Sequence, residues 1–181
     1  HRLHRIATPP KPTYQPTDLK PMLEKVIARA KTKAAEKTGV HAGSAGVQGI
    51  KLLVADGIEP ARMDPELFAD ALTEVVVNAL EAGPKGCVEI QAFAEAGEDR
   101  LVIQITDDGR GMSEHALAHA TDPFFSEKPA GRQSGLGLAL AHRLLQAQGA
   151  SLAMQSRLNR GTAVAVMLPH WRWSTHAQNA A

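Results

Sequence analysis

Residues 101–112 read LVIQITDDGRGM, an apolar run that ends in two acids and two glycines. Alternation of apolar side chains predicts a β-strand and places Asp107 on its apolar face. A carboxylate that points into a core is costly without a hydrogen-bond donor, and the exocyclic amine of a purine is one such donor. Gly109 and Gly111 can bring bare backbone close to a flat ring. A tight Asp-Gly turn is the alternative interpretation, and this stretch alone leaves both open.

Further elements are predicted on both sides of this run. Residues 87–95 alternate in the same way and join the run through the short turn at 96–99, which predicts an antiparallel hairpin. Strand pairs combined with long amphipathic helices predict an α/β fold, a two-layer sandwich. Helices are expected at 17–39, 63–83 and 135–150, strands at 50–55, 151–157 and 162–169, and a long loop at 108–134.

The composition is that of one globular domain. The 181 residues are 44% hydrophobic and 22% charged, which is enough for a sizeable core. A formal net charge of +1 argues against a broad basic surface for nucleic acid or for an anionic membrane. Cys87 is the only cysteine, which excludes a disulfide framework and favours a reducing, cytoplasmic location. No apolar stretch approaches the ~20 residues of a membrane span.

The two ends of the chain differ from its centre. Residues 1–17 begin with a short basic stretch, read as the end of a helix, and continue into a linker with four prolines. Residues 18–170 are expected to form the main domain, and residues 171–181 a tail without a clear pattern. The chain begins without Met, so we expect a fragment of a longer protein, whose membrane attachment stays open.

The helix predicted at 63–83 carries polar residues beside its apolar face. Asp64 is a natural N-cap, and Gly83 is expected to end the helix. Glu74 and Asn78 are four residues apart, so their side chains lie over one another at the margin of the core. A half-shielded carboxylate can orient or deprotonate a hydroxyl or water, and an amide oxygen can hold Mg²⁺. A solvated helix edge is the alternative interpretation.

A third polar group lies near the C-terminal helix. The sequence GLGL at 135–138 opens this helix, where free N–H groups and the helix dipole favour a phosphate. The preceding loop carries Phe124 and Phe125 followed by Lys128 and Arg132, which suits an apolar anchor and cations that close over a triphosphate. Packing glycines and an aromatic-anchored loop are the alternative.

In this order the motifs resemble the ATP-binding catalytic domain of sensor histidine kinases, the Bergerat fold shared with gyrase, Hsp90 and MutL ATPases. The resemblance covers about residues 18–169 and implies a mixed, mostly antiparallel sheet packed on about three helices. The resembling segments are EVVVNALEA (the N box), DDGRGM (the first glycine box), DPFFSEK (the F box), SGLGLAL (the second glycine box) and RGTAVAVMLP (the closing strand).

The resemblance implies that the site binds ATP and Mg²⁺. Asp107 would accept the adenine amine, Thr162 would help to hold the base through water, and Asn78 would bind Mg²⁺. Residues 112–134 would form a mobile lid. The other residues expected to contact ATP are Gly109, Gly111, Met112, Phe125, Lys128, Arg132, Gly135, Leu136 and Gly137.

Two positions depart from the pattern of this family. Glu74 stands where a second Asn is usual, which leaves its role open between polarising an acceptor histidine and orienting a Mg²⁺-bound water. Gln133 replaces the first glycine of a frequent Gly-x-Gly-x-Gly. An ATPase or an anti-sigma-type serine kinase of the wider superfamily, or a degenerate nucleotide-sensing module, are therefore alternatives to a histidine kinase.

The resemblance also implies partners. A histidine kinase needs an acceptor histidine on a dimerising helical hairpin, and none of the eight histidines here has that sequence context. The hairpin and its acceptor are expected upstream, where they would make the full-length protein a homodimer. The phosphate would then pass to a response regulator receiver domain.

Overall fold

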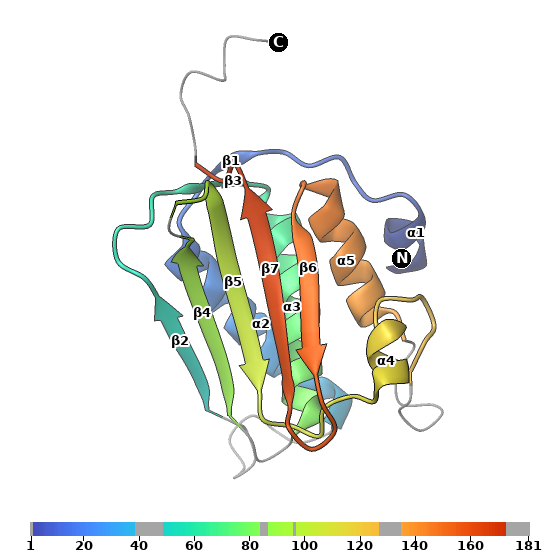
Figure 1. The fold of residues 1–181 in the computed structure, drawn as a ribbon. Helices are drawn as coiled ribbons and strands as arrows, with labels where there is room; N and C mark the ends of the chain where they lie inside the picture. Colours follow the sequence, from blue (N-terminus) through green and yellow to red (C-terminus); the bar gives the residue numbers. More distant parts are fainter. Residues whose placement is uncertain (1, 39–48, 84–86, 96, 127–134, 173–181) are drawn as a thin grey trace.

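The computed structural model describes residues 2–38, 49–83, 87–95, 97–126 and 135–172 as one α/β unit (Figure 1). Its centre is a five-stranded sheet with the order β2-β4-β5-β7-β6. Helices cover one face of this sheet, which gives the two layers predicted from the sequence. The strands are β2 (Ile50–Val54), β4 (Val88–Ala94), β5 (Arg100–Asp107), β6 (Ser151–Ser156) and β7 (Thr162–Pro169).

Two antiparallel hairpins, β4–β5 and β6–β7, form most of the sheet. They join through β5 and β7, whose antiparallel register places Asp107 opposite Thr162. β2 adds to β4 in parallel, so the sheet is mixed and mostly antiparallel, as predicted. The β5–β7 pairing is decisive for the site because it brings the end of β5 to the start of β7.

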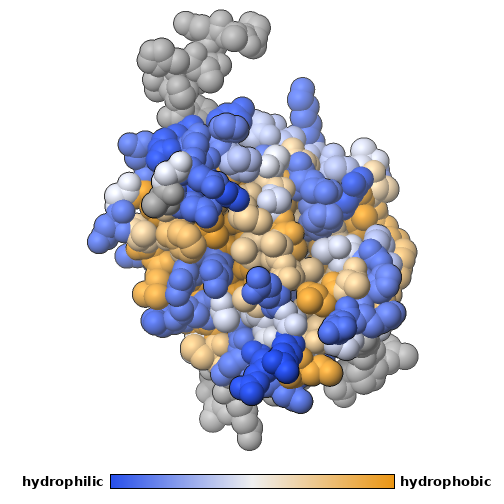
Figure 2. All heavy atoms as spheres, in the orientation of Figure 1, coloured by the Kyte–Doolittle hydropathy of each residue, from blue (hydrophilic) through white to orange (hydrophobic). Residues whose placement is uncertain are grey.

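Three long helices form the second layer (Figure 1). Their apolar faces and the inner face of the sheet share one core, in which Phe68, Leu72 and Leu144 are fully buried. The opposite sheet face carries no helix in Figure 1, and Figure 2 shows apolar side chains there among hydrophilic ones. The helices are α2 (Leu19–Thr38), α3 (Pro65–Ala82) and α5 (Gly137–Ala147), with the short α1 (Arg2–Ala7) and α4 (Glu114–Ala118) outside this layer.

α3 begins as the sequence predicts. The Asp64 side chain accepts hydrogen bonds from the backbone N–H groups of Glu66 and Leu67, which otherwise lack partners in the first turn. α3 also ends where the sequence predicts, but Gly83 is needed there for another reason. Gly83 has φ of −147°, an extended conformation open to any residue, but a Cβ there would lie 2.9 Å from the Cα of Gly109. Close packing, rather than a left-handed cap, therefore requires Gly83.

Two features were not expected from the sequence. β1 (Gln15–Thr17), within the predicted linker, pairs with the short β3 (Ala61–Met63) in a separate two-stranded sheet. The predicted tail from residue 171 begins differently, because Trp171 is buried in the core and its carbonyl accepts a hydrogen bond from Arg62 N. Trp171 belongs to no periodic apolar pattern, and its backbone is tied to β3 by the hydrogen bond from Arg62.

Candidate functional site

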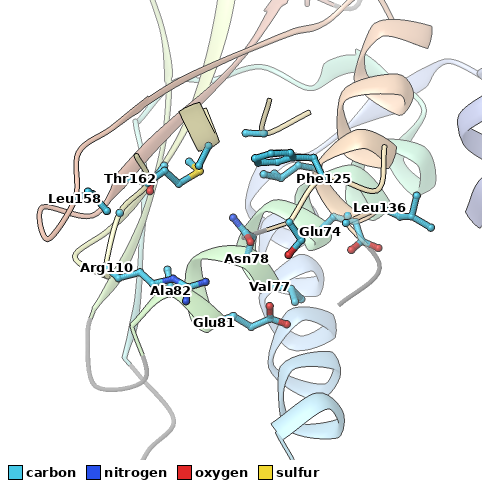
Figure 3. Close-up of a pocket in the computed structure, with 18 of the residues that line it drawn as sticks. Glu74, Val77, Asn78, Glu81, Ala82, Arg110, Phe125, Leu136, Leu158 and Thr162 are labelled. Atoms are coloured by element: carbon cyan, nitrogen blue, oxygen red, sulfur yellow. The ribbon is translucent and has the colours of Figure 1, made fainter. Parts of the chain in front are cut away.

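A cavity of about 390 Å³ lies beside the C-terminal half of α3 (Figure 3). Its other walls are the segment after β5, the N-terminus of α5 and the turn between β6 and β7. The volume falls in the range of pockets that hold small-molecule ligands and cofactors. The cavity brings together nine of the residues that the sequence singled out: Glu74, Asn78, Gly111, Met112, Phe125, Gly135, Leu136, Gly137 and Thr162.

Asp107 lies at the end of the cavity where β5 meets β7. Its side chain is buried, as the alternation of β5 predicts, and Oδ1 accepts a hydrogen bond of 2.9 Å from Gly109 N. Burial raises the pKa of Asp107 above its ordinary value, and hydrogen bonds from the backbone of Gly109 and Thr162 oppose that shift. Thr162 forms part of the cavity wall, whereas Asp107, its partner in the β5–β7 register, does not.

The glycines of DDGRGM are required by the protein's own backbone. A Cβ on Gly109 would lie 2.6 Å from the carbonyl carbon of Ala82, the last residue of α3. Gly111 has φ of +64°, and a Cβ there would lie 2.0 Å from the carbonyl oxygen of Arg157. The sequence interpretation, that these glycines let the backbone approach a flat ring, is thus incomplete. The space beside Gly109 and Gly111 is filled by the backbone of α3 and of the β6–β7 turn. Gly111 lines the cavity and Gly109 does not.

A small hydrogen-bond network fixes the segment that follows. The hydroxyl of Ser156 accepts from Met112 N at 2.9 Å, lies 2.9 Å from the Thr162 hydroxyl and donates to Gly161 O. Asn159 N donates to Arg110 O at 2.7 Å. Sequence reasoning missed Ser156, because its role depends on strand pairing that no local pattern encodes.

The second acid of the motif has a structural partner. Asp108 is exposed, and its Oδ1 accepts a hydrogen bond of 2.9 Å from Cys87 N. The next residue, Arg110, donates its backbone N–H to Ala82 O and so satisfies a carbonyl at the end of α3. The segment after β5 is therefore bound to both neighbouring elements.

Glu74 and Asn78 face the cavity from α3 (Figure 3). Asn78 is half-buried, as expected, but only 6% of the Glu74 side chain is exposed, so neither a solvated edge nor a half-shielded margin describes it. Oε1 of Glu74 forms an ion pair with Lys33 Nζ of α2. The sequence analysis missed Lys33, since it lies 41 residues away and on another helix.

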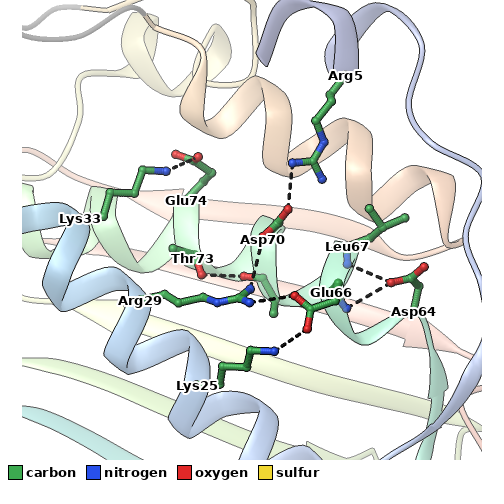
Figure 4. Close-up of polar contacts among 11 residues, drawn as sticks. Arg5, Lys25, Arg29, Lys33, Asp64, Glu66, Leu67, Asp70, Thr73 and Glu74 are labelled. Atoms are coloured by element: carbon green, nitrogen blue, oxygen red, sulfur yellow. Dashed lines mark hydrogen bonds and ion pairs between the residues drawn. The ribbon is translucent and has the colours of Figure 1, made fainter. Parts of the chain in front are cut away.

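This ion pair belongs to a series between α2 and α3 (Figure 4). Lys25 and Arg29 both pair with Glu66, and hydrogen bonds, first from Lys25 and then from Arg29, lower the pKa of Glu66. Arg29 also reaches Asp70. These outer pairs are well exposed, so each contributes little to stability, whereas the Lys33–Glu74 pair is largely shielded from water.

The N-terminus of α5 forms the opposite end of the cavity. Gly135, with φ of +62°, lies against the backbone of Phe124 and Phe125, where a Cβ would meet atoms at 2.6 Å. The N-cap residue of α5, Leu136, makes no side-chain capping hydrogen bond, and the start of this helix lines the cavity, which suits an anion. Gly137 faces Glu74, and a Cβ there would lie 3.2 Å from Oε2 of Glu74.

The two phenylalanines differ, contrary to the expected paired anchor. Phe125 lines the cavity and lies about 5.5 Å from the ring of His119, whereas Phe124 is 66% exposed. His115 and His119 are exposed. Lys128, Arg132 and Gln133 lie outside the described residues.

Asn78 is a residue of the cavity wall that could take part in holding a metal ion. No group of three or more His, Cys, Asp or Glu side chains among the described residues could hold a metal ion. Mg²⁺ takes few protein ligands and completes its shell with phosphates and water, and the Asn78 amide oxygen suits that role.

In the part of the chain that the structure describes, no helix has both the length and the apolar character to cross a membrane.

The chain is similar to several sensor kinases. It is 27% identical over 121 residues to the sensor histidine kinase ZraS of Salmonella typhimurium, which covers 66% of this chain and 25% of that protein. It is 30% identical over 138 residues to the signal transduction histidine-protein kinase AtoS of Escherichia coli, covering 74% of this chain and 22% of that one. The chain thus spans about a quarter of the length of these relatives.

A solved structure agrees with the fold. Full-length ShkA in complex with AMPPNP has a TM-score of 0.76 at 22% identity, over 96% of this chain and 34% of that chain. Residues 63–172, which contain nearly all the cavity walls, match the family model described as histidine kinase-, DNA gyrase B-, and HSP90-like ATPase. The chain belongs to this ATPase family and is homologous to the catalytic domains of sensor histidine kinases.

Proposed function

We propose that the cavity binds Mg²⁺–ATP and that this chain is the catalytic domain of a two-component sensor histidine kinase. The domain transfers the γ-phosphoryl group of ATP to a histidine on an upstream dimerisation domain, from which it passes to a response regulator. The observation that carries this proposal is the cavity with two different ends. One end is lined by Thr162, which pairs with Asp107 and its buried carboxylate, and the other is the N-terminus of α5, which has no side-chain cap.

Each end suits one part of ATP. A buried carboxylate that accepts a hydrogen bond from the protein still has lone pairs for the exocyclic amine of adenine. The N–H groups at the start of α5 suit phosphate oxygens, and Asn78 lies on the wall between the two ends. Catalysis then depends on position and on charge neutralisation, which Mg²⁺ supplies when it is bound through Asn78.

Titration of the isolated chain with ATP tests the base end. Asp107→Asn replaces an acceptor-only group by one that presents its own donors, so we expect ATP affinity to fall about tenfold or more. Asp108→Asn is the matched control, because it makes the same change at the neighbouring exposed acid, and it should keep wild-type affinity. Unchanged ATP affinity in Asp107→Asn would refute the adenine assignment.

Phosphoryl transfer is tested with the longer protein. The full-length chain, or this chain supplied with its upstream hairpin, should form an acid-labile phosphate when given Mg²⁺–ATP. We place this domain in the cytoplasm and the dimer contact in the upstream hairpin, with residues 18–170 as the catalytic unit, to whose core Trp171 adds. Binding of ATP without any transfer, even with the hairpin present, would favour a nucleotide-sensing module instead.

The burial of Glu74 beside the phosphate end supports one second candidate, ATP hydrolysis or transfer to a serine. A shielded carboxylate there can orient a water or a hydroxyl toward the γ-phosphate. Steady hydrolysis by the isolated chain that is lost in Glu74→Ala would favour this candidate over histidine transfer.

A further inference from the structure

The Glu74 carboxylate has two different neighbours on its two oxygens. Oε1 pairs with Lys33 Nζ of α2. Oε2 faces the first turn of α5, where a Cβ added to Gly137 would lie 3.2 Å away. The carboxylate is therefore held between a cation on one side and the expected phosphate end of the cavity on the other.

This position carries an electrostatic cost for a phosphate ligand. Glu74 is shielded from water, so its negative charge acts on nearby phosphates through a medium of low dielectric constant. An unpaired carboxylate there would repel the ligand, and the repulsion would grow with each phosphate that reaches the start of α5. A paired carboxylate presents almost no net charge.

We propose that Lys33 is a positioning residue of the nucleotide site: by pairing with Glu74 it sets the preference of the cavity for a triphosphate over shorter phosphates. Lys33 is not part of the cavity wall, whereas Glu74 is, so it acts through Glu74 and not by direct contact with phosphate. This inference rests on the proposed function, because it requires that the cavity accept a nucleotide with its phosphates toward α5.

The chain contains a matched comparison for this role. Lys25 pairs with Glu66 between the same two helices and with the same residue types, as Figure 4 shows. The Glu66 side chain is 59% exposed, whereas the Glu74 side chain is 6% exposed, and Glu66 is not part of the cavity wall. Any effect that comes only from losing a lysine between α2 and α3 should therefore be the same for both lysines.

The test compares Lys33→Met with Lys25→Met by titrating ATP, ADP and AMP. Titrations are made in EDTA, so that a metal ion does not mask the phosphate charge. We expect Lys33→Met to weaken ATP binding about tenfold, ADP binding less and AMP binding by no more than about twofold. Lys25→Met should leave all three affinities unchanged, and Lys33→Arg, which keeps the cation, should restore the ATP preference.

Removing the charge of Glu74, the other member of the ion pair, should have the opposite effect on ATP affinity. Glu74→Gln should hold or raise ATP affinity in both the wild-type and the Lys33→Met background, because no negative charge then needs neutralising. Equal losses for ATP and AMP in Lys33→Met, or a Lys33→Met, Glu74→Gln double variant as weak as Lys33→Met alone, would overturn the inference. If the wild-type chain binds none of the three nucleotides, either in EDTA or with Mg²⁺ present, the proposed function itself fails.

Discussion

The two ends of the cavity are built in different ways. At the base end, Gly109 and Gly111 fit against the backbone of α3 and of the β6–β7 turn, where any side chain would overlap fixed atoms. At the phosphate end, Gly135 also lies against backbone, that of Phe124 and Phe125, but Gly137 meets only the end of one side chain, the carboxylate of Glu74. The glycines of the base end are thus fixed by backbone, whereas Gly137 at the phosphate end faces a movable charged side chain. Substitutions at the two ends should therefore fail differently.

The largest effect is expected at Gly111. In Gly111→Ala the Cβ would lie 2.0 Å from the carbonyl oxygen of Arg157, and φ of +64° adds strain for any L side chain. Neither backbone can move without breaking the contact between the segment after β5 and the β6–β7 turn. We expect a loss of about 3 kcal/mol or more in the free energy of unfolding, measured by chemical denaturation.

Gly57 provides the control for the strain alone. Its φ of +74° resembles that of Gly111, but nothing lies within 4 Å of an added Cβ. Gly57→Ala should therefore cost only about 1 kcal/mol. Equal losses in the two variants would show that backbone conformation, and not the fit between the two segments, is what Gly111 supplies.

A smaller effect is expected from the charge of Asp107. Burial raises its pKa above the ordinary value of 3.8, so the folded protein binds this proton more tightly than the unfolded chain does. The group therefore favours folding below pH 3.8, and that contribution is lost as the pH rises through the raised folded pKa. Asp107→Asn, which keeps an acceptor for Gly109 N, should be more stable than wild type at neutral pH and lose that advantage in acid.

Denaturation of both proteins across the acid range checks this prediction. A wild-type chain that is the more stable of the two at neutral pH would indicate that the ionised carboxylate is fully compensated by the hydrogen bonds of Gly109 and Thr162. In Asp107→Asn, the gain in stability and the loss of ATP affinity should have the same cause. The buried carboxylate destabilises the fold but accepts a hydrogen bond from the ligand.

The sequence predicted the base end better than the phosphate end, for a physical reason. The strand alternation that places Asp107 in the core is local, and so is the Asp64 cap that begins α3. Buried Glu74 pairs with Lys33 of another helix, and buried Trp171 contacts a short strand that has no periodic signal. The glycines were recognised, but their contacts follow from the pairing of β5 with β7. Local patterns thus predicted the elements, while contacts between distant elements required the structure.

The phosphate end should respond to Gly137→Ala in affinity and not in stability. Alanine favours a helix over glycine by up to about 1 kcal/mol, which offsets a close contact of 3.2 Å with a movable side chain. The added methyl group must displace Oε2 of Glu74, so ATP affinity should fall about threefold, a change of about 0.7 kcal/mol. Unchanged ATP affinity together with a lowered free energy of unfolding would show that Gly137, like Gly111, is needed for packing and not for the charge at the phosphate end.

The smallest effect is expected at Asp108, immediately beside the base end. Its carboxylate accepts one exposed hydrogen bond from Cys87 N, and such a bond contributes about 0.5–1 kcal/mol. Asp108→Ala should therefore lower the free energy of unfolding by no more than that and leave ATP affinity unchanged. Asp108→Asn keeps an acceptor oxygen and should recover most of the lost stability. A loss of ATP affinity in Asp108→Ala would mean that the segment 108–111 is not held by the contacts of Gly109 and Gly111 alone, because one surface hydrogen bond would then control the position of the cavity wall.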